Sequence, residues 1–146
     1  MNRVKTSGLF RAMGFTLVEL LVVLIILGLV ASIAGPNVMN YLGSSKSKTA
    51  RLQLKEIESS LELLFLDTGL YPSTSQGLEA LVKKNPALPG WNGPYFKKGV
   101  VPEDPWGRPY RYVSPGEHGP FDLYSLGSDG QPGGDGDAAD VVNWAG

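Results

Sequence analysis

The chain has 146 residues, of which 13 are basic and 14 acidic, and it contains no cysteine. This length suits one modest domain with an appendage and argues against a second domain. The near-zero net charge indicates neither nucleic acid nor an anionic surface as a partner, and the lack of cysteine excludes disulfides and thiolate chemistry.

A hydrophobic run extends from Phe15 to Ala34, and its only charged residue is Glu19. As a helix rising about 1.5 Å per residue, the run would span roughly 30 Å, which is the thickness of a bilayer core. The segment before it is basic and has no acid, as is typical of the cytoplasmic flank of an exported segment. Its cations are Arg3, Lys5 and Arg11.

Two interpretations of this run remain open. Ser32-Ile33-Ala34 is similar to a signal peptidase site, so the run could be an ordinary signal peptide. Glu19 argues against that, because a carboxylate in an apolar span costs about 2 to 3 kcal/mol on insertion and a disposable signal gains nothing from it. No cation lies within the run, so processing or another molecule must supply the partner of Glu19.

The segment Gly14-Phe15-Thr16-Leu17-Val18-Glu19, followed by the apolar run, resembles the N-terminal signal of type IV pilins and pseudopilins. The resemblance implies that a prepilin peptidase cleaves after Gly14 and methylates the new terminal amine on Phe15. It also implies that Glu19 pairs with the Phe15 ammonium of a neighbouring subunit, which would remove the cost of two unpaired charges. We therefore expect residues 1–14 to be a cleaved leader and residues 15–35 to be the transmembrane and assembly segment.

The helical pattern continues beyond this segment. Gly35-Pro36 predicts a kink or a local break. Apolar residues then recur at three- and four-residue spacing, and Thr68-Gly69 indicates the end of the helix. These apolar residues are Leu54, Ile57, Leu61 and Leu64. Such a helix would be roughly 76 Å long, so its first part must be buried in lipid or in copies of itself, unless it is a simple membrane tether.

After Gly69, turn-forming residues alternate with short aromatic segments. Ser75 is placed to cap a short helix that presents Leu78, Leu81 and Val82 on one face. Strands are predicted at 110–113 and 121–126, joined by a loop that contains Pro115-Gly116. We expect an α+β fold in which the long helix packs on a small antiparallel sheet.

This C-terminal region resembles the major pseudopilins of bacterial type II secretion systems more closely than pilins in general. The matching segments are YPSTSQGLEAL, WNGPYFKK, DPWGRPYRY and GEHGPFDLYSLGSDG. The resemblance implies a pilin-like fold, a single-pass anchor in the inner membrane, a periplasmic domain over 36–146, and a helical homopolymer that serves protein export. It implies as partners a prepilin peptidase, minor pseudopilins and an inner-membrane assembly platform. The alternatives are a type IV pilus subunit and a membrane-anchored periplasmic calcium-binding protein.

An acidic, glycine-rich tract follows Leu126 and contains no cation; its acids are Asp129, Asp135, Asp137 and Asp140. Hard oxygen ligands on a flexible backbone suit calcium, but the spacing is not that of an EF-hand. The residues alone support a solvated acidic loop equally well. The resemblance favours calcium, and implies one structural ion held by the side chains of Asp129, Asp137 and Asp140 and by the carbonyls of Leu126 and Ser128.

No pattern indicates catalysis. His118 is the single histidine, and its place in a predicted turn favours an exposed loop residue over a catalytic base. Glu103 and Asp104 lie between prolines and predict a solvated turn. Because no phosphate loop or dinucleotide-binding glycine pattern occurs, we expect a structural protein and not an enzyme.

Overall fold

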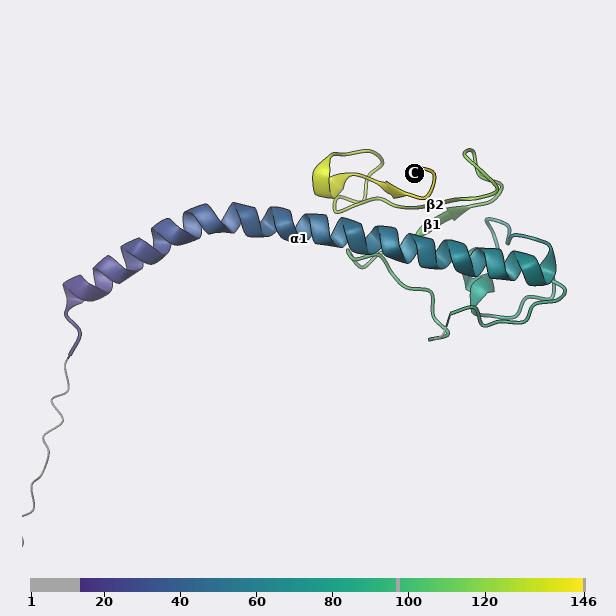
Figure 1. Ribbon diagram of the computed structural model, residues 1–146, viewed down its shortest axis with the longest axis horizontal. Coiled ribbons are helices and arrows are strands. Elements are labelled where there is room, and N and C mark those ends of the chain that lie inside the picture. Colours follow the sequence, from purple (N-terminus) through teal and green to yellow (C-terminus); the bar gives the residue numbers. More distant parts are fainter. Residues whose placement is uncertain (1–13, 97, 146) are drawn as a thin grey trace, which may run out of the picture. The chain divides into compact units, whose positions relative to one another are not determined.

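The computed structural model describes residues 14–96 and 98–145, so nearly all of the predicted leader lies outside the described residues. The chain divides into two compact units, Met1–Val38 and Met39–Gly146. The elements in chain order are α1 (Leu17–Thr68), η1 (Leu78–Leu81), β1 (Arg111–Val113), β2 (Asp122–Ser125), η2 (Gly136–Ala138) and β3 (Val141–Val142) (Figure 1).

The ends of α1 are defined by local hydrogen bonds. The Glu19 amide donates to Thr16 Oγ1 at 3.2 Å, which makes Thr16 the N-cap. At the other end, the Gly69 amide donates to the Phe65 carbonyl at 2.7 Å, and Gly69 adopts φ 71°, as is common after a helix C-terminus. The predicted end at Thr68 is therefore confirmed. Pro36 lies inside α1, so the predicted break of the helix at this position is wrong for the single chain.

The part of α1 in the first unit has no core of its own. Every described residue from 14 to 38 is exposed, although nearly all of them are apolar. By length and composition, α1 contains a segment able to cross a membrane.

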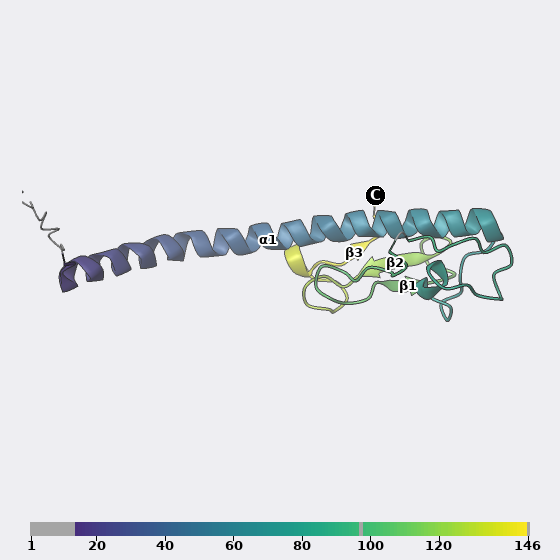
Figure 2. The ribbon, with the colours of Figure 1, turned by 90° about the horizontal axis from the view of Figure 1, so that it is seen from below.

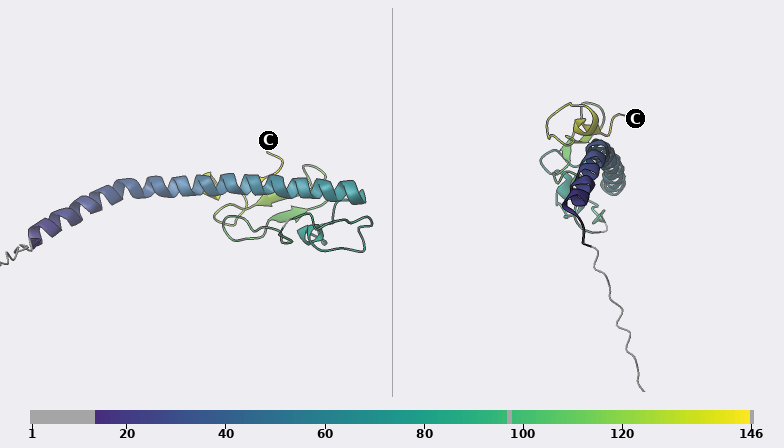
Figure 3. Two further views of the ribbon diagram at one scale, coloured as in Figure 1. Left: turned by 60° about the horizontal axis from the view of Figure 1, so that its bottom comes forward. Right: turned by 90° about the vertical axis from the view of Figure 1, so that its left-hand side faces the viewer.

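The second unit has one hydrophobic core, built on the amphipathic part of α1. Leu54, Ile57, Leu61 and Leu64 are buried together, which confirms the predicted apolar face. The sheet contributes the other side of the core with Tyr110, Tyr112, Phe121, Leu123 and Val141. The sheet lies along one side of this part of α1 (Figures 2 and 3).

The sheet is antiparallel, with strand order β1-β2-β3. Tyr112 pairs with Leu123 between β1 and β2, and Tyr124 pairs with Val142 between β2 and β3. Both predicted strands are confirmed with slightly narrower bounds, whereas β3 was not predicted.

The prediction that Ser75 caps a helix is wrong. The short helix η1 is a 3-10 helix that follows Gly77, which has no side-chain capping bond. The Ser75 hydroxyl instead lies 2.9 Å from the Ser73 hydroxyl, and the Ser73 amide donates to Gln76 Oε1 at 2.7 Å. These bonds form a local turn in place of a helix N-terminus.

Two tyrosine hydroxyls connect the sheet region to the rest of the unit. Tyr110 donates to Gln53 Oε1 of α1 at 2.7 Å, and Tyr112 donates to the Pro72 carbonyl at 2.8 Å. Burial raises the pKa of both Tyr110 and Tyr112, that of Tyr112 to about 12. Both hydroxyls therefore remain protonated donors at neutral pH.

We expect Leu61→Ala to lower the free energy of unfolding by about 2 to 5 kcal/mol, because it leaves a cavity at a fully buried position. The matched control is Leu63→Ala on the same helix, where the side chain is 53% exposed. Urea unfolding of the detergent-extracted chain, followed by tryptophan fluorescence, measures both. Equal losses in the two variants would contradict the assignment of the core face.

Candidate functional site

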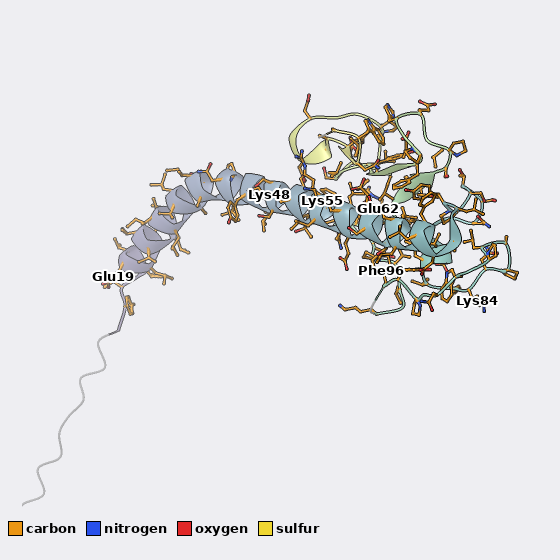
Figure 4. The ribbon with its side chains drawn as sticks, turned by 45° about the vertical axis from the view of Figure 1, so that its right-hand side comes forward. Glu19, Lys48, Lys55, Glu62, Lys84 and Phe96 are labelled. Carbon is orange, nitrogen blue, oxygen red and sulfur yellow. The ribbon has the colours of Figure 1, made fainter. Side chains whose placement is uncertain are left out.

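The N-terminal end of α1 carries the residues predicted for processing and assembly. Phe15 precedes the helix and is 78% exposed, and Glu19 lies in the first helical turn (Figure 4). Among the residues that the structure describes, the Glu19 carboxylate has no hydrogen-bond or ion-pair partner. Its charge is therefore free to bind a group from outside this chain.

Thr16 is a residue of this end that sequence reasoning did not assign. Thr16 and Glu19 have the spacing of a capping box, of which one bond, from the Glu19 amide to Thr16 Oγ1, is formed. An acid in the first turn is also stabilised by the helix dipole. Glu19 thus contributes to the start of α1 in addition to its predicted part in assembly.

The acidic loop, residues 126–140, connects β2 to β3 and is held in shape by its own backbone. The Ser128 amide donates to the Asp137 carbonyl at 3.0 Å, and the Asp140 amide donates to the Gly133 carbonyl at 3.1 Å. Gly127 has φ 59°, and a Cβ there would lie 2.6 Å from the Ala138 carbonyl oxygen. The two arms of the loop therefore cross closely at a point that only glycine permits.

The aspartates of this loop have different environments. Asp129 Oδ1 accepts from the Gln131 amide, and Asp140 Oδ2 accepts from the Gly133 amide, both at 2.9 Å. Asp137 lies against α1, since a Cβ placed on Gly43 would be 2.8 Å from Asp137 Cγ. Asp135 is exposed and makes no side-chain capping bond to η2.

The oxygen atoms of the loop fit the coordination of a hard cation only in part. Asp140 Oδ1 is buried and has no hydrogen-bond donor, which leaves a desolvated carboxylate oxygen available. The Leu126 carbonyl already accepts from the Gly130 amide at 3.1 Å. Within residues 14–96 and 98–145, no three or more His, Cys, Asp or Glu side chains converge as a metal site, so the predicted ligands Asp129, Asp137 and Asp140 are not gathered around one point.

A buried turn anchors the start of the acidic loop. Asp104 is only 5% exposed, so the prediction of a solvated turn is wrong for this residue. Its carboxylate accepts from the Trp106 and Arg108 amides at 3.0 and 2.9 Å, and from the Ser125 hydroxyl at 2.6 Å. The Arg108 guanidinium donates to the Gly127 carbonyl. These contacts satisfy a buried charge and hold the end of β2 beside the loop.

His118 is exposed, as predicted, but it belongs to a cluster that the sequence did not indicate. Its ring stacks on Trp144 with centroids 4.2 Å apart, and its Nδ1 lies 3.0 Å from Asp122 Oδ2. The Asn143 amide donates to the Leu123 carbonyl at 3.0 Å. This cluster attaches the C-terminal segment to β2.

Protonation of the Asp122 carboxylate should make the domain less stable in acid. Burial alone raises its pKa, but hydrogen bonds from the His118 ring and from the Glu117 and His118 amides lower the pKa below its usual value. A lowered folded-state pKa gives stability that is present above about pH 4 and is lost as the pH falls through that lowered value.

We therefore expect Asp122→Asn to lower the urea midpoint at neutral pH, and the difference from the unaltered chain to shrink below about pH 4. Urea titrations between neutral and acidic pH measure this. Glu117→Gln is the control, since only the Glu117 backbone amide binds Asp122. A difference that stays constant across this range would refute a stabilising charge on Asp122.

Comparisons with known proteins agree with this architecture. The family described as type II secretion system (T2SS), protein G matches residues 37–144, and the prokaryotic N-terminal methylation motif matches residues 14–35. A type II secretion system core protein G from Pseudomonas aeruginosa is 50% identical over 135 residues, covering 90% of this chain and 94% of the relative. Its counterpart in Vibrio cholerae is 44% identical over 134 residues, covering 90% of each.

A solved structure is similar as well. The crystal structure of the major pseudopilin from the type 2 secretion system of enterohaemorrhagic Escherichia coli matches with a TM-score of 0.63 and 33% identity, covering 73% of this chain and 88% of that one. Together with the capped apolar start of α1 and the helix-on-sheet domain, these matches show that the chain belongs to the type II secretion system protein G family, the major pseudopilins.

Proposed function

We propose that this chain is a structural subunit that polymerises into the pseudopilus of a type II secretion system and so serves protein export. The observation that carries the proposal is the long, exposed apolar start of α1, which has no core of its own. Such a surface is stable only in a membrane or against other copies of the same helix. A pseudopilus subunit uses both environments, first as a membrane anchor and then as part of the fibre core.

The first step is processing of the N-terminus. Cleavage after Gly14 by a prepilin peptidase, followed by methylation, would place a charged amine on Phe15. The exposure of Phe15 and its position just before α1 support access to this bond. Residues 15–35 would then be the transmembrane segment and residues 36–146 the periplasmic domain.

Glu19 supplies the partner for that amine. Its carboxylate has no partner among the described residues and lies on an otherwise apolar part of α1. Moving an unpaired carboxylate and an unpaired ammonium into a fibre core costs free energy for each, whereas pairing them between neighbouring subunits offsets both costs. The same contact would define how far one subunit is displaced from the next.

The acidic loop would hold one structural calcium ion. The side chains of Asp129, Asp137 and Asp140 and the carbonyls of Leu126 and Ser128 would supply hard oxygen ligands. The buried, partnerless Asp140 Oδ1 supports a cation at this place. Since the three carboxylates do not form a cluster in the structure, Asp129 and Asp137 would have to turn toward the ion. The ion would then stabilise a loop that has little apolar content.

The remaining partners follow from assembly in the inner membrane and periplasm. Minor pseudopilins and an inner-membrane assembly platform would be needed to start and extend the fibre. The proposed role is mechanical, since the relatives are core proteins of a secretion system and a major pseudopilin. Loss of protein export on deletion of the chain, with surface pili intact, would separate this role from that of a type IV pilus subunit.

We expect Glu19→Ala to abolish pseudopilus formation while membrane insertion persists, because the substitution removes the partner of the Phe15 amine and also a charge that opposes insertion. Fibres are measured by shearing and electron microscopy, and insertion by membrane fractionation. Thr16→Ala is the matched control, since it removes the helix cap but keeps the carboxylate. Normal fibres from the Glu19→Ala variant would refute the proposed pairing.

Calcium should raise the thermal midpoint of the unaltered chain relative to the same sample in a chelator, because an ion that binds only the folded state stabilises it. We expect Asp140→Asn to remove most of this rise. Asp135→Asn should keep it, because Asp135 is outside the proposed ligand set. A midpoint that does not respond to calcium in the unaltered chain would overturn the calcium site while leaving the fibre role intact.

A further inference from the structure

Arg108 brings a positive charge to the acidic loop, which has four aspartates and no cation of its own. The residue lies before β1 and outside the loop, and its Nη2 donates a hydrogen bond to the Gly127 carbonyl. Sequence reasoning assigned no role to Arg108, because Arg108 and Gly127 are 19 positions apart. The contact exists only in the folded domain.

The backbone of Arg108 is fixed by a buried turn. Its amide donates to Asp104 Oδ1 at 2.9 Å, and its carbonyl accepts from the Asp104 amide at 2.7 Å. The Asp104 side chain is only 1% exposed, and it also accepts from the Ser125 hydroxyl at the end of β2. Arg108 therefore extends toward the loop from a base that is hydrogen-bonded on both sides.

The guanidinium bridges a turn at the start of the acidic loop, residues 126–130, which we call the 126–130 turn. The Gly130 amide closes this turn by donating to the Leu126 carbonyl at 3.1 Å. Arg108 Nη2 binds the Gly127 carbonyl, and Nη1 lies so close to Gly130 that a Cβ on this glycine would overlap it. One side chain thus contacts both halves of the turn.

The side chain of Arg108 is directed at the 126–130 turn and not at Asp104. Its Nε is buried and has no hydrogen-bond partner, and only a long ion pair of 3.9 Å connects it to Asp104 Oδ2. A buried donor without a partner costs free energy. The guanidinium keeps Nη1 and Nη2 on the turn in spite of this cost.

The 126–130 turn carries the two backbone oxygens proposed as calcium ligands. The Gly127 carbonyl lies between the carbonyls of Leu126 and Ser128 along the chain. Each peptide group is planar and is joined to the next through only two rotatable bonds, so a hydrogen bond that fixes the Gly127 carbonyl also restricts its neighbours. Removal of groups that orient metal ligands typically lowers metal affinity by about 10- to 100-fold.

We propose that Arg108 is a positioning residue for the calcium ion of the acidic loop. Its guanidinium orders the 126–130 turn before the ion binds, so that the Leu126 and Ser128 carbonyls need little rearrangement. Arg108 does not bind the ion itself, because a guanidinium has hydrogen-bond donors and no acceptor. This inference rests on the calcium site proposed above and adds to it a residue from outside the loop.

A cation beside the loop also has an opposite effect, since its charge repels calcium. Arg111 provides the comparison that separates charge from position. Arg111 lines the same cavity of about 80 Å³ as Arg108, Leu126 and Gly130, and it has no ion-pair partner among the described residues. Loss of either arginine removes one positive charge beside the 126–130 turn, but of the two it is Arg108 that is hydrogen-bonded to the turn.

We expect Arg108→Met to weaken calcium binding by about 10- to 100-fold. Calorimetric titration of calcium chloride into the detergent-extracted full chain measures this affinity. Arg111→Met is the matched control and should bind calcium as tightly as the unaltered chain, or slightly more tightly, because it removes only charge. An Arg108→Met variant that binds calcium as tightly as Arg111→Met would overturn the proposal.

Thermal unfolding separates positioning from a purely structural role. A structural role predicts that Arg108→Met lowers the thermal midpoint equally in calcium and in a chelator, which leaves the calcium-induced rise unchanged. Positioning predicts a smaller rise, because weaker binding to the folded state stabilises it less at the same calcium concentration. An unchanged rise would therefore contradict the proposal.

Arg108→Lys keeps the experiment decisive if Arg108→Met does not fold. Lysine retains the charge but has one ammonium group in place of a fork, so it cannot hold both halves of the 126–130 turn. We expect Arg108→Lys to bind calcium more weakly than the unaltered chain, and equal binding would refute positioning by Arg108. An unaltered chain that does not bind calcium would instead refute the ion site, and the role of Arg108 with it, while the pseudopilus role would stand.

Discussion

The hydrophobic start of α1 needs an apolar environment, because it has no core of its own. Residues 14–38 are exposed and nearly all apolar, whereas the buried core of the chain begins at Ala50. Helix formation satisfies the backbone hydrogen bonds of this segment but does nothing for its side chains. The proposed membrane anchor, the proposed assembly with copies of the same chain and the proposed pairing of Glu19 all follow from this lack of cover for the apolar side chains.

One helix therefore has two different tasks. Its second part carries a leucine and isoleucine face that packs on the three-stranded sheet, with Tyr110 hydrogen-bonded to Gln53 across the contact. The opposite face of this part keeps Leu52, Leu63 and Leu66 exposed, although a monomer gains nothing from leaving them in water. Exposed apolar residues are expected where a surface is completed only by assembly.

The acidic loop and the turn beside it are held by polar contacts, because the loop has few apolar residues to bury. The buried Asp104 binds Ser125 and two backbone amides, and Arg108 reaches the Gly127 carbonyl at the start of the acidic loop. Beyond that loop and β3, Trp144 stacks on His118. The segments on both sides of the acidic loop are thus fastened to the sheet, and the loop between them is where we propose a calcium ion.

Local pattern in the sequence was sufficient for the apolar start of α1, the buried face and end of this helix, and β1 and β2. Each of these elements is predicted by a pattern among neighbouring residues: an unbroken apolar run, a helical spacing, a glycine after the last turn or an aromatic alternation. The sequence also identified Glu19 as a charge in need of a partner, since that inference requires only its apolar neighbours.

Tertiary structure alone decided which residues far apart in the chain meet. Asp104 is buried beside Ser125, Asp137 lies against Gly43 of α1, and His118 joins Trp144. The two-residue strand β3 is too short to have a pattern of its own and exists because β2 pairs with it. Burial and pairing of this kind depend on which distant segments the folded chain brings together. The spacing of residues within one segment does not predict these contacts.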